Sequence, residues 1–279
     1  MTDSLFIFNE RSGSYDPALV AEIEQLFAQS DWPLSRVRDI GEGALPDAAA
    51  AQAQNLDLIV VLSGDGTLAA VAESLTGWEG ALLILPGGTM NLLSRTLHGD
   101  RTAQDIVRAY LDGQGSILRP PVILAGDFTV YTGVIAGPTA AWGNVREALR
   151  NFDLTALADK VPAALSATFD SPGVTLEGEE QDYPAIFVEP STAGLRAYGV
   201  LATGAGDLFK HGWAWLAGDF RDGPSEPLGT AEHFKLCSRG ETLDLLVDGE
   251  KADTKSPLEM KLGRAGVHFF AAQGEKGWR

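Results

Sequence analysis

The chain has 279 residues, 45% hydrophobic and 21% charged, enough for one large domain or two ordinary ones with sizeable cores. Its formal net charge of −17 argues against broad nucleic-acid binding and against docking on anionic lipid by charge alone. It has one cysteine, no signal-like start and no apolar run near the ~20 residues that cross a bilayer, so we expect a cytoplasmic protein without transmembrane segments.

The first part of the chain alternates strand-like and helix-like segments. Residues 5–8 are apolar and predict a strand, and Asp16 followed by Pro17 is typical of a helix N-cap and first helical position. A second strand is expected over residues 37–40, and an alanine-rich helix over residues 46–54.

Two apolar runs then end in glycine-rich turns. Residues 56–62 and 81–85 each have the pattern of a buried parallel strand. The turns SGDGT (63–67) and PGGTMN (86–91) follow them, and a helical pattern follows each turn. Such turns place backbone N–H groups at a helix N-terminus, where an anion is favoured. Glycine, having no Cβ, allows the backbone to approach a phosphate closely.

A helix capped by Asp100 is expected to complete this region, and the alternation predicts a parallel α/β sheet over residues 1–120. From residue 121 to residue 279 the pattern changes to a hairpin that turns at Gly126-Asp127, a helical region over 138–165 and many short strands. These strands predict an antiparallel, β-rich sandwich or barrel. The last segment is a candidate to return to the first domain.

The turns together resemble the catalytic family of diacylglycerol kinases, which includes sphingosine kinases and bacterial lipid kinases. Residues 9–13 (NERSG) are similar to its N-P-x-S-G turn, with glutamate in place of proline. Residues 63–67 are similar to its G-G-D-G-T loop, and residues 86–91 to its P-L-G-T-x-N segment. Residues 246–250 (LVDGE) are similar to its late D-G-E turn.

The resemblance implies a kinase that uses ATP and Mg²⁺ to phosphorylate a hydroxyl of a diacylglycerol-like or sphingoid lipid, reached transiently at the inner face of the membrane. Residues 1–120 would be the nucleotide-binding domain and residues 121–279 the lipid-substrate domain. Asp65 would orient Mg²⁺ or its waters, and Glu250 would be the general base. The implied nucleotide-binding residues are Asn9, Ser12, Ser63, Gly64, Asp65, Gly66, Thr67, Thr89 and Asn91.

Each of the two acids also has a structural interpretation. Asp65 can cap its own turn with its side chain. Asp248-Gly249 between apolar runs is also typical of a hairpin turn, which would leave Glu250 as an exposed turn acid.

Two departures from the family bear on activity. Ala69 and Ala70 stand where the family has an asparagine and a glutamate after its G-D-G-T loop. Ala193, in segment 191–195, stands where the family has an aspartate that carries a structural Mg²⁺, and alanine offers no oxygen ligand. We therefore expect no structural Mg²⁺ at this segment.

Two other functions stay open. The first is a catalytically impaired relative that binds nucleotide and acts as a regulatory or binding module. The second is an NAD kinase, since that related fold shares the G-D-G-T loop. Thr89, Asn91 and the late D-G-E turn favour the lipid kinase.

Overall fold

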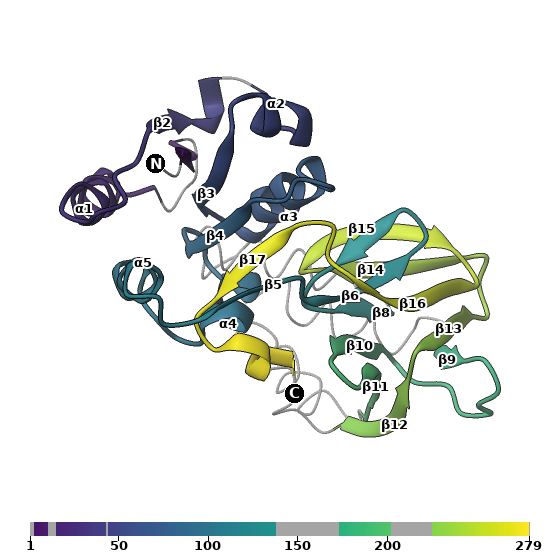
Figure 1. The fold of residues 1–279 in the computed structure, drawn as a ribbon. Coiled ribbons are helices and arrows are strands. Elements are labelled where there is room, and N and C mark those ends of the chain that lie inside the picture. Colours follow the sequence, from purple (N-terminus) through teal and green to yellow (C-terminus); the bar gives the residue numbers. More distant parts are fainter. Residues whose placement is uncertain (1–2, 11–14, 43, 138–172, 202–224, 279) are drawn as a thin grey trace, which may run out of the picture. The chain divides into compact units, whose positions relative to one another are not determined.

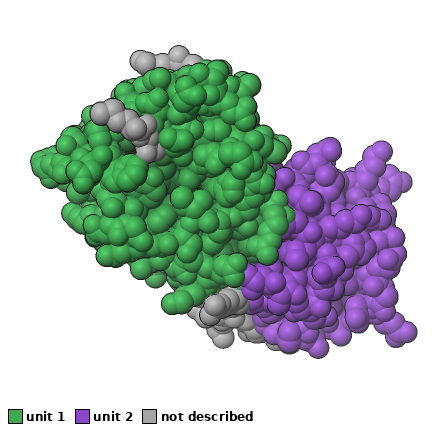
Figure 2. Space-filling model, in the orientation of Figure 1, with its two compact units in different colours: residues 1–121, 264–279 green, residues 122–263 purple. Residues whose placement is uncertain are grey.

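The computed structural model divides the chain into two compact units (Figure 2). The first comprises residues 1–121 and 264–279, and the second residues 122–263. The structure describes residues 3–10, 15–42, 44–137, 173–201 and 225–278.

The first unit contains a six-stranded sheet of order β2-β1-β3-β4-β17-β5. Every neighbouring pair in it is parallel except β17 and β5. Its strands are β1 (Asp3–Phe8), β2 (Arg36–Asp39), β3 (Leu56–Ser63), β4 (Ala81–Pro86), β5 (Ser116–Leu118) and β17 (His268–Ala271). The sheet therefore takes one strand, β17, from the end of the chain.

Helices pack on both faces of this sheet (Figure 1). Helices α1 and α5 contact each other on one face and share a core with Phe6 and Val60 of the sheet. Helices α2, α3 and α4 contact the sheet on the other face. The helices are α1 (Pro17–Ala28), α2 (Ala48–Ala53), α3 (Asp65–Ser74), α4 (Leu92–His98) and α5 (Ala103–Leu111), with short 3₁₀ turns η1 (Ile40–Glu42) and η3 (Gly274–Trp278).

One of the two predicted helix caps is confirmed. Asp16 caps α1, its carboxylate accepting from the Ala18 N–H at 2.9 Å, and a proline opens the helix. The prediction that Asp100 caps α5 is wrong: Thr102 is the N-cap, and its hydroxyl accepts from the Asp105 N–H at 3.2 Å. Asp100 instead pairs with Arg95 at 3.1 Å. Thr102 takes the cap because it lies directly before the first helical residue.

The second unit packs two antiparallel sheets around one hydrophobic core. One has the order β12-β11-β10-β8-β14-β15, and the other the order β7-β6-β16-β13-β9. Its strands are β6 (Pro121–Ala125), β7 (Phe128–Val130), β8 (Val134–Ala136), β9 (Val174–Leu176), β10 (Ile186–Ser191), β11 (Gly194–Val200), β12 (Ser225–Ala231), β13 (His233–Ser238), β14 (Thr242–Val247), β15 (Glu250–Lys255) and β16 (Leu258–Arg264).

The predicted fold class is confirmed: a parallel α/β sheet is followed by an antiparallel β-rich unit. The predicted hairpin at Gly126-Asp127 joins β6 to β7, with Ala125 opposite Phe128. The helical region expected over residues 138–165 lies outside the described residues. In the part of the chain that the structure describes, no helix combines the length and the apolar character needed to cross a bilayer.

His98, at the end of α4, is a fully buried polar residue of the first unit. Its Nδ1 accepts from the Ala272 N–H at 3.3 Å, and its ring stacks on Phe270. Burial lowers the pKa of His98 from 6.5 to about 3. The Ile84 carbonyl opposes this lowering of the pKa, and the positive charge of Arg101 adds to it.

We expect acid to destabilise the first unit through His98. Between about pH 6.5 and pH 3 the unfolded chain binds a proton that the folded chain excludes, so the unfolding free energy falls as the pH falls. The slope is at most about 1.4 kcal/mol per pH unit. Denaturant titrations from pH 7 to pH 5 should show a shallower slope in His98→Gln. The matched control is His233→Gln, which removes an exposed histidine and leaves the buried ring in place. Equal slopes in all three proteins would contradict the prediction.

Candidate functional site

Three sequence motifs meet at the carboxyl edge of the parallel sheet. Asn9 follows β1, the SGDGT turn begins at the end of β3, and the PGGTMN turn begins at the end of β4. These strands are neighbours, in the order β1-β3-β4. The chain passes from β1 outward to β2 and then back to β3 on the other side of β1. In open α/β sheets, ligands bind at the carboxyl edge where the strand order reverses in this way.

The two glycine turns pack against each other backbone to backbone. The Gly87 N–H donates to the Ser63 carbonyl at 3.1 Å. A Cβ on Gly87 would lie 2.7 Å from the Ser63 nitrogen, and a Cβ on Gly88 would lie 2.7 Å from the Gly64 Cα. Glycine is thus required at 87 and 88 by the contact between the turns, which is a structural reason separate from phosphate approach.

Alanine substitutions in this contact should have unequal effects. A Cβ on Gly64 would meet the Gly88 Cα at 3.6 Å, an ordinary contact. We therefore expect Gly64→Ala to stay within about 1 kcal/mol of wild-type stability. Gly88→Ala forces one backbone away from the other and should cost about 1–3 kcal/mol. Denaturant unfolding of the two variants measures the difference, and equal stabilities would show that the turns separate easily.

Asn91 closes the second turn on itself. Its Oδ1 accepts from the Gly88 N–H at 2.7 Å, and its Nδ2 donates to the Gly88 carbonyl at 2.9 Å. Its backbone is left-handed, with φ of 52°, a conformation that asparagine tolerates better than most residues. Although Asn91 is the N-cap residue of α4, its side chain makes no capping hydrogen bond to that helix.

Asp65 supplies the missing cap of α4. It lies in the first turn of α3, only 7% exposed, and its Oδ1 accepts from the Leu93 N–H at 3.2 Å. A carboxylate between two helix N-termini is favoured by both helix dipoles. Asp65 therefore joins the first turn of α3 to the N-terminus of α4. From the sequence, Asp65 is interpreted as a cap of its own turn or as a metal-orienting residue, and neither interpretation predicts its contact with α4.

The other expected nucleotide-binding residues differ in accessibility. Gly66 and Thr89 are exposed, whereas Ser63 is buried and its Oγ has no hydrogen-bond partner among the described residues. Half-buried positions are Asn9, Gly64, Thr67, Ala69 and Ala70. Ser12 lies outside the described residues. The first turn of α3 is thus reachable from solvent at Gly66.

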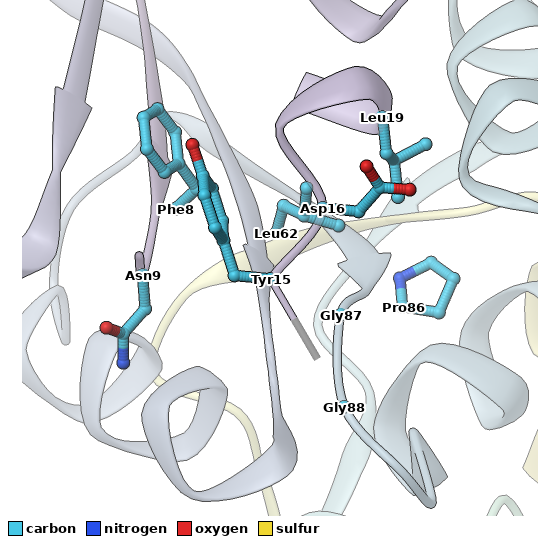
Figure 3. Close-up of a pocket in the computed structure, with 9 residues that line it drawn as sticks. All are labelled: Phe8, Asn9, Tyr15, Asp16, Leu19, Leu62, Pro86, Gly87 and Gly88. Atoms are coloured by element: carbon cyan, nitrogen blue, oxygen red, sulfur yellow. The ribbon is translucent and has the colours of Figure 1, made fainter. Parts of the chain in front are cut away.

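A small pocket lies beside these turns at the reversal point of the sheet (Figure 3). Its volume is about 100 Å³, somewhat less than the ~150 Å³ of an apolar cavity that takes up benzene. The rings of Phe8 and Tyr15 stack along one side, with centroids 5.8 Å apart. The lining residues are Phe8, Asn9, Tyr15, Asp16, Leu19, Leu62, Pro86, Gly87 and Gly88.

The surroundings of this pocket are acidic. Asp16 lines it, and the Tyr15 hydroxyl donates to the Glu10 carboxylate at 3.3 Å. The Asp39 carboxylate accepts from the Glu10 N–H at 3.1 Å. Burial, together with the negative charge of Glu10, raises the pKa of Tyr15. Among the described residues, the charged groups named around the pocket are thus negative, which favours an uncharged or cationic group over a phosphate.

The D-G-E turn belongs to the second unit, where it joins β14 to β15. Asp248 and Gly249 have φ of 48° and 82°, the two left-handed residues of a tight hairpin turn. Glu250 is exposed and pairs with Val247 across the hairpin. Asp248, by contrast, is only 7% exposed. The sequence interpretation took Asp248 as a turn former, and its burial was missed.

The segment expected to lack a metal is also a hairpin turn, between β10 and β11. The Ser191 hydroxyl donates to the Gly194 carbonyl at 2.7 Å and accepts from the Ala193 N–H at 3.2 Å. Within the described ranges, no cluster of three or more His, Cys, Asp or Glu side chains could hold a metal ion. The absence of Mg²⁺ from this segment stays a prediction.

Residues 3–117 match the family model of the diacylglycerol kinase catalytic domain. The resemblance to this family is thus confirmed over that segment. The matched segment contains both glycine turns, Asn9 and the pocket, and it ends before the D-G-E turn. No curated protein matches the chain.

Solved structures extend the likeness in fold to the whole chain. A crystal structure of a diacylglycerol kinase from Bacillus anthracis is 18% identical, covers 96% of each chain and has a TM-score of 0.64. Two further structures from that organism have TM-scores of 0.63 and 0.65. Yeast NADH kinase complexed with NADH is 11% identical, with a TM-score of 0.50 over 99% of this chain and 85% of that one. At these identities the likeness shows the fold alone.

Proposed function

We propose that this protein is an ATP-dependent kinase that phosphorylates a hydroxyl of a diacylglycerol-like or sphingoid lipid. The observation that carries the proposal is the pair of mutually packed glycine turns at the carboxyl edge of the sheet, inside the segment that matches a kinase catalytic domain. With a net charge of −17, the protein would meet its lipid only transiently, at the cytoplasmic face of the membrane.

In this proposal the phosphates of ATP bind at the N-terminus of α3. The first turn of that helix is accessible at Gly66, and its backbone N–H groups and dipole favour an anion. Asp65 offers a carboxylate and Ser63 an unpartnered hydroxyl in the same turn, and oxygen donors of this kind suit Mg²⁺. When bound, Mg²⁺ would neutralise phosphate charge. The two side chains would orient the ion or its waters.

The pocket beside the turns would hold an uncharged part of the nucleotide. Its volume of about 100 Å³ is below the 300–1,000 Å³ of sites that enclose a whole small molecule. Because Asp16 and Glu10 would repel phosphate, the base or ribose suits this pocket better than the triphosphate chain does.

Filling the pocket should therefore weaken nucleotide binding. Leu19 lines the pocket from α1, and Leu19→Trp would occupy much of its volume. We expect a loss of ATP affinity of ~10-fold or more, the scale of 1.4 kcal/mol, in calorimetric titration. Ala21 is exposed on the same helix and does not line the pocket, so Ala21→Trp is the matched control. Equal affinities of the two variants would remove the pocket from the nucleotide site.

The proposed chemistry places Glu250 as general base. Its carboxylate would take the proton of the lipid hydroxyl while that oxygen attacks the γ-phosphorus and ADP leaves. Phosphoryl transfer depends mainly on positioning and charge neutralisation, so the helix N-terminus, the metal and one base suffice.

Transfer of labelled γ-phosphate from ATP tests the function directly. With Mg²⁺ present, we expect labelling of diacylglycerol or a sphingoid base in mixed micelles and none of NAD or NADH. Labelling of NAD or NADH alone would favour the NAD kinase alternative, which the fold of yeast NADH kinase and the shared loop keep open.

A regulatory or binding module is the other alternative, favoured by Ala69, Ala70 and Ala193 in place of the family's polar residues. It predicts ATP binding without transfer to any acceptor. Calorimetry with ATP beside the transfer assay separates it from the kinase.

A further inference from the structure

The buried carboxylate of Asp248 holds the hairpin turn against a distant loop of the second unit. Its Oδ2 accepts from the Tyr131 N–H at 2.9 Å, and its Oδ1 accepts from the same N–H at 3.1 Å. Its Oδ1 also accepts from the Thr132 N–H at 2.6 Å, the Thr132 hydroxyl at 2.7 Å and the Gly133 N–H at 3.2 Å. In return, the Asp248 N–H donates to the Gly133 carbonyl at 3.0 Å.

The loop that Asp248 grips has little freedom of its own. Tyr131 is 3% exposed, and a Cβ on Gly133 would lie 2.4 Å from the Phe187 ring. Directly after this loop, β8 pairs with β14, with Val134 opposite Val247. The turn is therefore tied to the core of the unit on both sides of Asp248.

This arrangement offsets two costs. A left-handed backbone at a residue other than glycine is strained by about 1–3 kcal/mol, and a buried carboxyl loses its hydration. Burial raises the pKa of Asp248, and the hydrogen bonds from residues 131–133 act in the opposite direction. An ordinary hairpin turn needs neither a buried acid nor hydrogen bonds to a loop more than a hundred residues away in sequence.

We infer that Asp248 is a positioning residue, whose carboxylate fixes the turn so that Glu250, two residues on, presents its side chain in one direction. The inference rests on the proposed function, in which Glu250 is the general base. A base in a tight turn can act only if the turn is held, because a displacement of about 1 Å can reduce turnover ~10²-fold.

Asp248→Asn is the informative variant. Asparagine tolerates the left-handed turn and keeps an acceptor in place of Oδ1, but its NH₂ group would face the Tyr131 N–H. We expect kcat to fall ~10- to 10²-fold with the KM for ATP within about twofold of wild type. Thr132→Val removes one hydrogen bond and should lower kcat several-fold. Thr129 lies in β7, outside the loop of residues 131–133 that Asp248 binds, and provides the matched control. Thr129→Val should leave kcat unchanged.

A double-mutant cycle distinguishes positioning from a purely structural role. If Asp248 acts through Glu250, Asp248→Asn should cause no further loss of kcat in the Glu250→Gln background. The assays are run below the unfolding temperature of every variant. Normal kcat in folded Asp248→Asn, or equal losses in both backgrounds, would overturn the inference while leaving the proposed function intact. Normal turnover in Glu250→Gln, or an inactive wild type, would overturn the proposed base and the inference with it.

Discussion

Replacing Glu250 by glutamine is expected to reduce turnover by ~10²-fold or more while leaving ATP affinity nearly unchanged. Glutamine has the shape of glutamate but cannot take a proton from the attacking hydroxyl. The residue is exposed at the start of β15, so the substitution should cost little stability. Steady-state labelling of the lipid, with ATP affinity from calorimetry, measures the two quantities separately.

The matched control is Glu259→Gln. Glu259 is exposed on β16 in the same unit, and its substitution should leave kcat unchanged. If both variants turn over at the wild-type rate, Glu250 is an exposed hairpin acid and the base must be sought elsewhere. If the wild type binds ATP but labels no acceptor, the binding-module alternative replaces the kinase.

The sequence predicts the central strands β1, β3 and β4 of the first sheet because they are buried on both faces. The apolar runs at 56–62 and 81–85 correspond to β3 and β4, and the segment at 5–8 to β1. The Asp16 cap and the Gly126-Asp127 hairpin were predictable from the residues within each segment. These features need only short-range information, which periodicity and turn chemistry provide.

Two edge strands of the second unit, β12 and β15, were not predicted, because their residues have little apolar periodicity. The edge strand β15 reads Glu-Lys-Ala-Asp-Thr-Lys and is mostly exposed, as befits an edge that must not pair with other chains. The edge strand β12 is similarly exposed. These segments form strands because neighbouring strands pair with them, and not because their own residues have an apolar pattern.

The candidate site was predictable as a set of motifs but not as a set of contacts. The contacts of Gly88 with Gly64, and of Asp65 with Leu93, join residues more than twenty positions apart. Nothing local distinguishes Asp248 from an ordinary turn aspartate, since its partners lie at Tyr131–Gly133. Tertiary packing decides these roles, and a single sequence does not display it.

Asp65 should separate into a structural and a metal-orienting contribution when two variants are compared. Asp65→Asn keeps an oxygen that can accept from the Leu93 N–H, so α4 stays capped and stability should change little. Asp65→Ala removes the cap and should cost about 0.5–2 kcal/mol. Both variants lose the negative charge proposed to orient Mg²⁺ or its waters.

The decisive measurement is therefore ATP affinity in Asp65→Asn with and without Mg²⁺. The wild type should bind ATP more tightly with Mg²⁺ than without it. The ion neutralises phosphate charge, which would otherwise be repelled by the acidic side chains around the neighbouring pocket. We expect Asp65→Asn to lose ~10- to 10²-fold of the affinity measured with Mg²⁺, the usual scale for groups that orient a metal or its waters, and to change little without it. The kcat of Asp65→Asn should fall as well. If the Mg²⁺ dependence persists in Asp65→Asn and only Asp65→Ala is impaired, Asp65 serves as the cap that joins α3 to α4, and the metal is held by other groups.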